Sequence, residues 1–160
     1  VLDDSTDQTV DVVRECVHRY SLLGYDIKQI RRADRTGFKA GALREGLATA
    51  RGEYIAIFDA DFVPRPDFLL KTIPHLVKDP NVGMVQTRWE HLNSEYSLLT
   101  RAQAMALDGH FVIEQSVRNK VGFFINFNGT AGVWKRECIN DAGNWNADTI
   151  RTMWLNNVGN

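Results

Sequence analysis

Apolar and polar residues follow one another along this chain in blocks that predict alternating helices and strands. Apolar residues recur at helical spacing between residues 10 and 20. Ser5 and Thr6 precede them and offer side-chain oxygens that can cap a helix, and Gly24 can end it in a left-handed conformation. A first helix is therefore expected here. A second helix is expected at residues 39–50, which are rich in Ala and Leu.

Shorter apolar segments predict strands. Residues 53–58 are apolar at nearly every position and rich in β-branched and aromatic side chains, as in a central parallel strand that is buried on both faces. Further strands are expected at residues 26–30, 82–87, 123–127 and 131–134, and further helices at residues 67–77, 97–118 and 136–141. This alternation predicts a layered α/β domain with a mostly parallel sheet.

Composition and charge narrow the class of protein. A chain of 160 residues with 44% apolar residues can form one globular domain with a sizeable core. The 19 basic residues and 20 acidic residues leave a net charge of -1, so no field of one sign is present to bind nucleic acid. Cys16 and Cys138 form no C-x-x-C pair, which argues against a disulfide framework or a cysteine zinc site and favours a reducing compartment.

The ends and the hydropathy of the chain add two expectations. No stretch approaches the roughly 18 consecutive apolar residues of a membrane-spanning helix, and no secretory leader pattern is present, so we expect this chain by itself to be soluble and cytoplasmic. The chain opens on the end of an apolar strand that runs directly into acidic residues. We therefore expect it to be truncated at its N-terminus.

Two pairs of aspartates follow apolar strands. Asp3 and Asp4 end the first segment, and Asp59 and Asp61 end the strand at residues 53–58. A parallel sheet would bring both pairs to one rim, where two charges 4 Å apart repel by about 4 kcal/mol at an effective dielectric of 20. A cation is therefore expected, and carboxylates suit Mg²⁺ or Mn²⁺ together with a phosphate-bearing ligand. The alternative is that each aspartate caps a helix or ends a loop.

The start of the second predicted helix can receive an anion. Lys39 and Gly41 lie in its first turn, where free N–H groups and the helix dipole favour a group such as a diphosphate. The alternative is an ordinary solvated lysine, with a glycine that allows close packing.

Four segments in order along the chain carry a recognisable set of motifs. They are Val-Leu-Asp-Asp-Ser-Thr-Asp at residues 1–7, Arg-Thr-Gly-Phe-Lys-Ala-Gly-Ala-Leu at residues 35–43, Phe-Asp-Ala-Asp-Phe at residues 58–62, and Phe-Asn-Gly-Thr-Ala-Gly-Val-Trp at residues 127–134. Together they resemble family 2 glycosyltransferases, most closely the membrane-bound branch with cellulose-synthase-like and glucomannan-synthase-like enzymes. The resemblance implies a partial GT-A catalytic core at residues 1–149 and a divergent tail at residues 150–160.

The resemblance also implies an activity and site residues. A sugar would pass with inversion from a UDP- or GDP-hexose donor to a glycan acceptor, giving a β-linked polysaccharide. Departure of the nucleoside diphosphate builds negative charge, which a fixed Mg²⁺ or Mn²⁺ stabilises. The implied donor-binding residues are Asp3, Asp4, Lys39, Gly41, Asp59, Asp61 and Gln86, with Asp59 and Asp61 as the metal ligands of a D-x-D motif, and the implied acceptor-side residues are Asn128, Gly129 and Thr130.

This chain lacks the residue that usually acts as the general base in the family that it resembles. That base is the Asp of a Thr-Glu-Asp motif after a Gly-Gly-Trp-like segment, and this chain has Arg151, Thr152 and Met153 at those positions. Asp148 belongs to the lead-in, so no catalytic residue is assigned. Because removal of a positioned base lowers a rate by roughly 10² to 10⁴, we expect a donor-binding fragment of a parent protein that is embedded at the cytoplasmic face of a membrane.

Other functions are compatible with the acidic pairs. A phosphoacceptor receiver domain also holds Mg²⁺ between acidic residues, but it needs a lysine after the last strand, where this chain has residues 128–130. A sugar nucleotidylyltransferase needs a Gly-rich phosphate loop near the N-terminus, which this sequence lacks. A module that binds a nucleotide-sugar without turnover is a third alternative.

Overall fold

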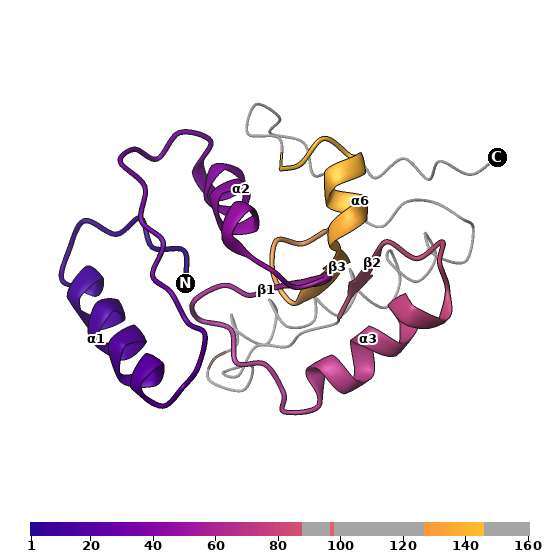
Figure 1. Cartoon of the computed structure of the whole chain (residues 1–160), viewed down its shortest axis with the longest axis horizontal. Coiled ribbons are helices and arrows are strands. Elements are labelled where there is room, and N and C mark those ends of the chain that lie inside the picture. Colours follow the sequence, from indigo (N-terminus) through magenta and orange to yellow (C-terminus); the bar gives the residue numbers. More distant parts are fainter. Residues whose placement is uncertain (88–96, 98–126, 146–160) are drawn as a thin grey trace. The chain divides into compact units, whose positions relative to one another are not determined.

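The computed structural model describes residues 1–87, 97 and 127–145, which fall into two compact units (Figure 1). The first unit contains residues 1–51 and 143–145, and the second contains residues 52–87, 97 and 127–142. Apart from residue 97, the predicted helix at residues 97–118 lies outside the described residues, and so does most of the predicted strand at residues 123–127. The same is true of residues 146–160, which include the positions expected to carry the general base.

The first unit contains two helices, α1 (Thr9–Leu22) and α2 (Phe38–Thr49). Both confirm the predicted segments, and Gly24 adopts a left-handed conformation with φ of 87° after α1. The predicted caps were wrong, because α1 begins after Gln8 without a side-chain cap. The Ser5 N–H instead donates to the Asp3 carboxylate at 3.0 Å, which places Ser5 in a separate turn.

The predicted strand at residues 26–30 is reduced to a single parallel bridge between Leu2 and Ile30. The Asp3 N–H donates to the Ile30 carbonyl at 3.0 Å, and the Ile30 N–H donates to the Val1 carbonyl at 2.8 Å. This short pairing suffices to bring the acidic residues at the start of the chain beside the loop that precedes α2.

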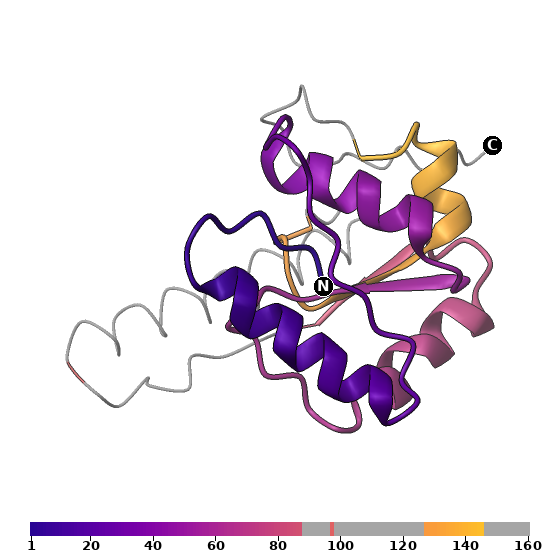
Figure 2. The same ribbon diagram turned by 60° about the vertical axis from the view of Figure 1, so that its left-hand side comes forward.

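The second unit contains a three-stranded sheet and two helices in its described part. The chain order is β1 (Tyr54–Ile57), α3 (Phe68–Lys78), β2 (Met84–Gln86), β3 (Gly132–Lys135) and α6 (Arg136–Asp141), and the strand order is β1-β3-β2. Figure 2 shows α3 and α6 on opposite sides of this sheet.

The layered α/β class is confirmed, but the expectation of a mostly parallel sheet is wrong for these strands. β3 pairs antiparallel with both β1 and β2, with Ile55 opposite Trp134 and Val85 opposite Val133. β1 and β2 do run in the same direction, as α3 between them requires. They do not pair because β3 lies between them in the opposite direction.

The inserted strand also takes the central place that was expected for residues 53–58. All four residues of β3 are buried, whereas β1 has one described neighbour and exposes Ala56. Val133 packs with Phe68 and Leu76 of α3, so α3 covers one face of the sheet. The buried sheet fixes the ends of β1, β2 and β3, and those ends carry the predicted site residues of this unit.

Candidate functional site

The predicted site residues divide between the two units. The first unit holds Asp3, Asp4, Lys39 and Gly41, and the second holds Asp59, Asp61, Gln86, Asn128, Gly129 and Thr130. Each group forms its own set of contacts. The convergence of Asp4 with Asp59 and Asp61 on one rim stays a prediction.

In the first unit, the carboxylate of Asp3 is bound by protein groups. Asp3 is only 5% exposed, and it accepts hydrogen bonds from the Ser5 N–H at 3.0 Å and from Gln29 Nε2 at 2.7 Å. The hydrogen bonding by Ser5 holds the pKa of Asp3 below its usual value. Gln29 Nε2 also donates to the Val10 carbonyl at 3.1 Å, so Asp3 is tied through Gln29 to α1.

Asp4 forms an ion pair with Arg32, a residue for which no role was predicted from the sequence. Arg32 Nε lies 3.2 Å from Oδ1 and 3.1 Å from Oδ2 of Asp4, and Nη2 also donates to Oδ2. These bonds lower the pKa of the Asp4 carboxyl and raise the pKa of the Arg32 guanidinium. The chain itself therefore supplies a positive partner for Asp4, and the cation expected at the shared rim stays a prediction.

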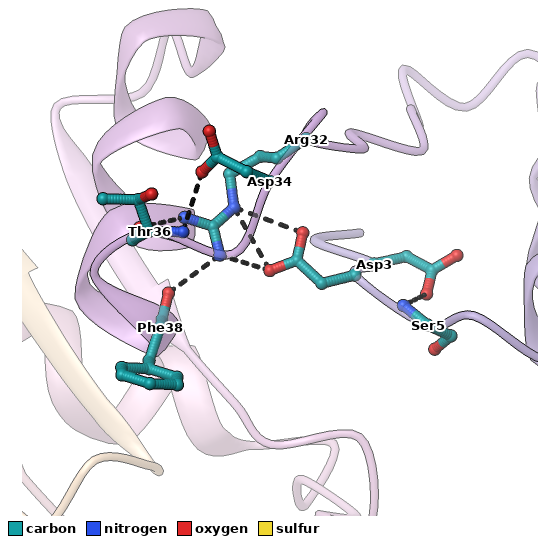
Figure 3. Close-up of polar contacts among 7 residues, drawn as sticks. Asp3, Ser5, Arg32, Asp34, Thr36 and Phe38 are labelled. Atoms are coloured by element: carbon teal, nitrogen blue, oxygen red, sulfur yellow. Dashed lines mark hydrogen bonds and ion pairs between the residues drawn. The ribbon is translucent and has the colours of Figure 1, made fainter.

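Arg32 also binds the loop in front of α2, as Figure 3 shows. Its Nη1 donates to the Thr36 carbonyl at 2.7 Å, and its Nη2 donates to the Phe38 carbonyl at 3.0 Å. The sequence offers only a weak signal for this role, which is the group of three arginines at residues 31, 32 and 35. Lys39 follows on the exposed side of the first turn of α2.

Close packing against Thr36 and Arg32 requires a glycine at residue 41. A Cβ atom on Gly41 would lie 2.2 Å from the Thr36 carbonyl oxygen and 2.4 Å from Arg32 Nη1, much closer than real Cβ atoms approach. The close-packing interpretation of this glycine is therefore supported. Its contact with a donor stays a prediction.

In the second unit, the D-x-D motif forms a tight turn after β1. The Phe62 N–H donates to the Asp59 carbonyl at 3.1 Å, and the rings of Phe58 and Phe62 stack with centroids 5.3 Å apart. The ring of Phe58 also packs edge-on against that of Phe68 in α3, with the ring centroids 4.8 Å apart. Aromatic packing thus anchors both ends of the turn, with Asp59 partly buried and Asp61 exposed.

A hydrogen bond joins the Asn-Gly-Thr turn to the D-x-D turn. The Asp59 N–H donates to Thr130 Oγ1 at 2.9 Å, across 71 positions of sequence. Thr130 is buried, and Gly129 and Ala131 on either side of it have positive φ angles of 86° and 55°. Such angles are uncommon for residues other than glycine, so the surrounding contacts must hold this turn in place.

Gln86 supplies several of those contacts. Its Nε2 donates to the carbonyls of Thr87 and Thr130 at 3.0 Å each, and its Oε1 accepts the Asn128 N–H at 3.1 Å. Thr87 adds a bond from its Oγ1 to the Ala131 carbonyl at 2.8 Å. Gln86 therefore fixes the Asn-Gly-Thr turn, and its expected contact with a donor sugar stays a prediction.

The carboxylates of the D-x-D turn are the candidate metal ligands. Among the residues that the structure describes, no group of three or more His, Cys, Asp and Glu side chains could hold a metal ion. Asp59 and Asp61 alone still fit Mg²⁺, which is usually bound by one or two carboxylates together with substrate phosphates. A metal at this turn would depend on the donor for its remaining ligands.

Comparison of the chain with known protein families agrees with the motifs that these turns carry. The family model described as "Glycosyl transferase family 2" matches residues 1–134. The chain therefore belongs to this family of enzymes, whose fold is GT-A, and the receiver-domain alternative is excluded.

Within this family, the chain is similar to enzymes named glucomannan 4-beta-mannosyltransferase. "Glucomannan 4-beta-mannosyltransferase 2" of Arabidopsis thaliana is 50% identical over 97% of this chain and 30% of its own length. "Probable glucomannan 4-beta-mannosyltransferase 7" of Oryza sativa subsp. japonica is 50% identical over 97% of this chain and 27% of its own length. The chain thus spans less than a third of the length of these curated relatives. Within the described residues, no helix has the length and apolar character needed to span a membrane.

Proposed function

We propose that this chain is the donor-binding core of an inverting β-glycosyltransferase that extends a β-linked polysaccharide. The donor is a nucleoside diphosphate hexose and the acceptor is a glycan hydroxyl. The relatives named glucomannan 4-beta-mannosyltransferase favour mannose as the transferred sugar. The parent protein lies at the cytoplasmic face of a membrane, with residues 1–149 as part of its catalytic core and residues 150–160 as a divergent tail.

The observation that carries this proposal is the assembly, in the second unit, of two distant motifs and Gln86. Asp59 of the D-x-D turn binds Thr130, and Gln86 binds the backbone from Asn128 to Ala131. A hydrogen-bonded network of this kind keeps the D-x-D turn and the Asn-Gly-Thr turn at a fixed separation. Such positioning is what transfer between two bound substrates requires.

Each motif has a chemical task in the proposed reaction. Asp59 and Asp61 hold Mg²⁺ or Mn²⁺ on the diphosphate, and this metal supplies the positive charge that stabilises the leaving group. Lys39 and the N-terminus of α2 add positive charge near the donor. Asn128, Gly129 and Thr130 border the acceptor. No residue of this chain is assigned as the general base, so the 160-residue chain binds the donor but turns it over slowly.

Calorimetric titration of the 160-residue chain tests donor binding. UDP and GDP are titrated separately with Mn²⁺ and then with EDTA. One of the two nucleotides should bind with Mn²⁺ and lose most of its affinity with EDTA. Asp61→Asn should weaken Mn²⁺-dependent binding, whereas the exposed Asp141→Asn in α6 serves as the matched control. Absence of binding by both nucleotides would refute the proposed function.

A module that binds a nucleotide-sugar without any turnover is the second candidate, and the Arg-Thr-Met sequence at the expected base positions favours it. A sugar-release assay with the nucleotide-sugar of the better-bound nucleotide distinguishes the two. Slow release that requires Mn²⁺ supports the enzyme core, and release that stays at the level of the buffer supports the binding module.

A further inference from the structure

Arg32 contacts three separate parts of the first unit. Each of its three guanidinium nitrogens donates to the protein, Nε and Nη2 to the carboxylate of Asp4, Nη1 to the Thr36 carbonyl and Nη2 also to the Phe38 carbonyl. The side chain is 10% exposed, and that of Asp4 is 16% exposed. This ion pair is therefore mostly shielded from water, and its geometry matters more than that of a surface pair.

The contacts of Arg32 require the shape of a guanidinium and not only its charge. A lysine ammonium is a compact point charge, whereas a guanidinium presents a rigid planar set of N–H groups. Only the planar group can bind a carboxylate along one edge and two backbone carbonyls along the others. Figure 3 shows Arg32 between these partners, with Thr36 and Phe38 on one side and the aspartate carboxylate on the other.

The backbone segment that Arg32 binds has an unusual conformation. Gly37 and Phe38 both have positive φ angles, 73° and 44°, at the entry to α2. Phe38 is not glycine, so this conformation needs outside support. The bonds of Arg32 to the carbonyls of Thr36 and Phe38 lie on either side of Gly37 and supply that support.

The missing side chain of Gly41 makes room for the same arrangement. The nearest atoms to a Cβ on Gly41 would be the Thr36 carbonyl oxygen and Arg32 Nη1. These two atoms are already joined by a hydrogen bond of 2.7 Å. A methyl group at residue 41 would therefore overlap with both atoms of this hydrogen bond.

We infer that Arg32 is a positioning residue for donor binding, because it locks Asp4 to the N-terminal turn of α2 that carries Lys39. This role rests on the proposed function. Arg32 itself makes no contact with the nucleotide in this scheme, since its nitrogens are occupied by protein groups. It sets the distance between the acidic residue expected to face the nucleoside and the lysine expected near the diphosphate.

Arg32→Lys tests this role in the 160-residue chain, with Arg44→Lys as the matched control on the exposed side of α2. The variant keeps the charge and loses the planar set of donors. UDP and GDP are titrated with Mn²⁺, and amide hydrogen exchange is followed in the peptide covering residues 34–41 without nucleotide. We expect affinity for the better-bound nucleotide to fall about tenfold or more, with faster exchange in this peptide. Arg44→Lys should match the wild type in both measurements.

Gly41→Ala provides a second variant that leaves every charge in place. It should show the same loss of nucleotide affinity and the same faster exchange as Arg32→Lys. Wild-type affinity or wild-type exchange in Arg32→Lys would overturn the role of Arg32 and leave the proposed function standing. If the wild-type chain binds neither nucleotide with Mn²⁺, the proposed function fails and the donor-positioning role fails with it, whatever the exchange measurement shows.

Discussion

At the scale of single residues, Thr130 connects the two turns of the second unit. Thr130→Val removes the oxygen that accepts the Asp59 N–H and preserves the shape of the side chain. Because a partly buried N–H is left without this partner, the free energy of unfolding should fall by roughly 1–3 kcal/mol. Mn²⁺-dependent nucleotide binding should weaken by about tenfold, which corresponds to about 1.4 kcal/mol. Urea unfolding and calorimetric titration measure the two effects.

Thr72→Val is the control for this substitution. Thr72 is a buried threonine whose Oγ1 donates to the Phe68 carbonyl within α3, at 2.9 Å. Its replacement changes stability without touching the D-x-D turn, so nucleotide affinity should stay at the wild-type value. Equal nucleotide affinity in Thr130→Val and the wild type would show that the hydrogen bond does not position the D-x-D turn.

The first unit should lose stability in acid. The pKa of Asp3 is lowered by hydrogen bonding from Ser5, and the pKa of Asp4 is lowered by its bonds to Arg32. A lowered folded pKa gives stabilisation that is fully present above the unfolded pKa of about 3.9 and is lost as the pH falls through the folded pKa. The free energy of unfolding should therefore decline below about pH 4, and Asp4→Asn should decline less steeply. Urea unfolding between pH 5 and pH 2 measures both slopes, and equal slopes would contradict the assignment.

Residue types and spacing predicted the motifs but not all of their contacts. The D-x-D turn, Gln86 and the Asn-Gly-Thr turn carry motifs that local sequence displays. Arg32 was missed because its partners Asp4 and Phe38 lie on different segments, which only the fold brings together. A polar segment has no periodicity to show which of its arginines is mostly shielded from water.

At the scale of elements, Lys135 joins the end of β3 to the end of α3. Its Nζ donates to the carbonyls of Asp79 and Pro80 at 3.2 and 3.0 Å, and the residue is 7% exposed. Lys135→Met keeps the apolar stem and removes both donors, so the free energy of unfolding should fall by about 1–2 kcal/mol. Lys78→Met on the exposed end of α3 should change it by less than about 0.5 kcal/mol. Urea unfolding of both variants measures the difference, and equal values would contradict a role for these bonds.

The elements themselves were easier to predict than their pairing. Periodicity located α1, α2, α3 and α6 to within a few residues of their ends. The order of the strands was not predicted, because β3 comes from a segment more than forty residues after β2 and enters the sheet between β1 and β2. Local patterns report that a segment is extended but carry little information about the direction of its neighbour.

At the scale of the whole chain, the question is whether 160 residues with Arg151, Thr152 and Met153 at the expected base positions can turn over a donor. A positioned base contributes roughly 10² to 10⁴ to a rate. The combined substitution Arg151→Thr, Thr152→Glu and Met153→Asp restores the family motif, so Mn²⁺-dependent sugar transfer should rise by about that factor. Nucleotide affinity should be unchanged, because the D-x-D turn and Arg32 are untouched. A version with Arg151→Thr and Thr152→Glu alone is the control, since it lacks the new carboxylate at residue 153. Equal rates in the control and the triple variant would show that this segment does not supply the base, and fast transfer by the unchanged chain would show that another residue does.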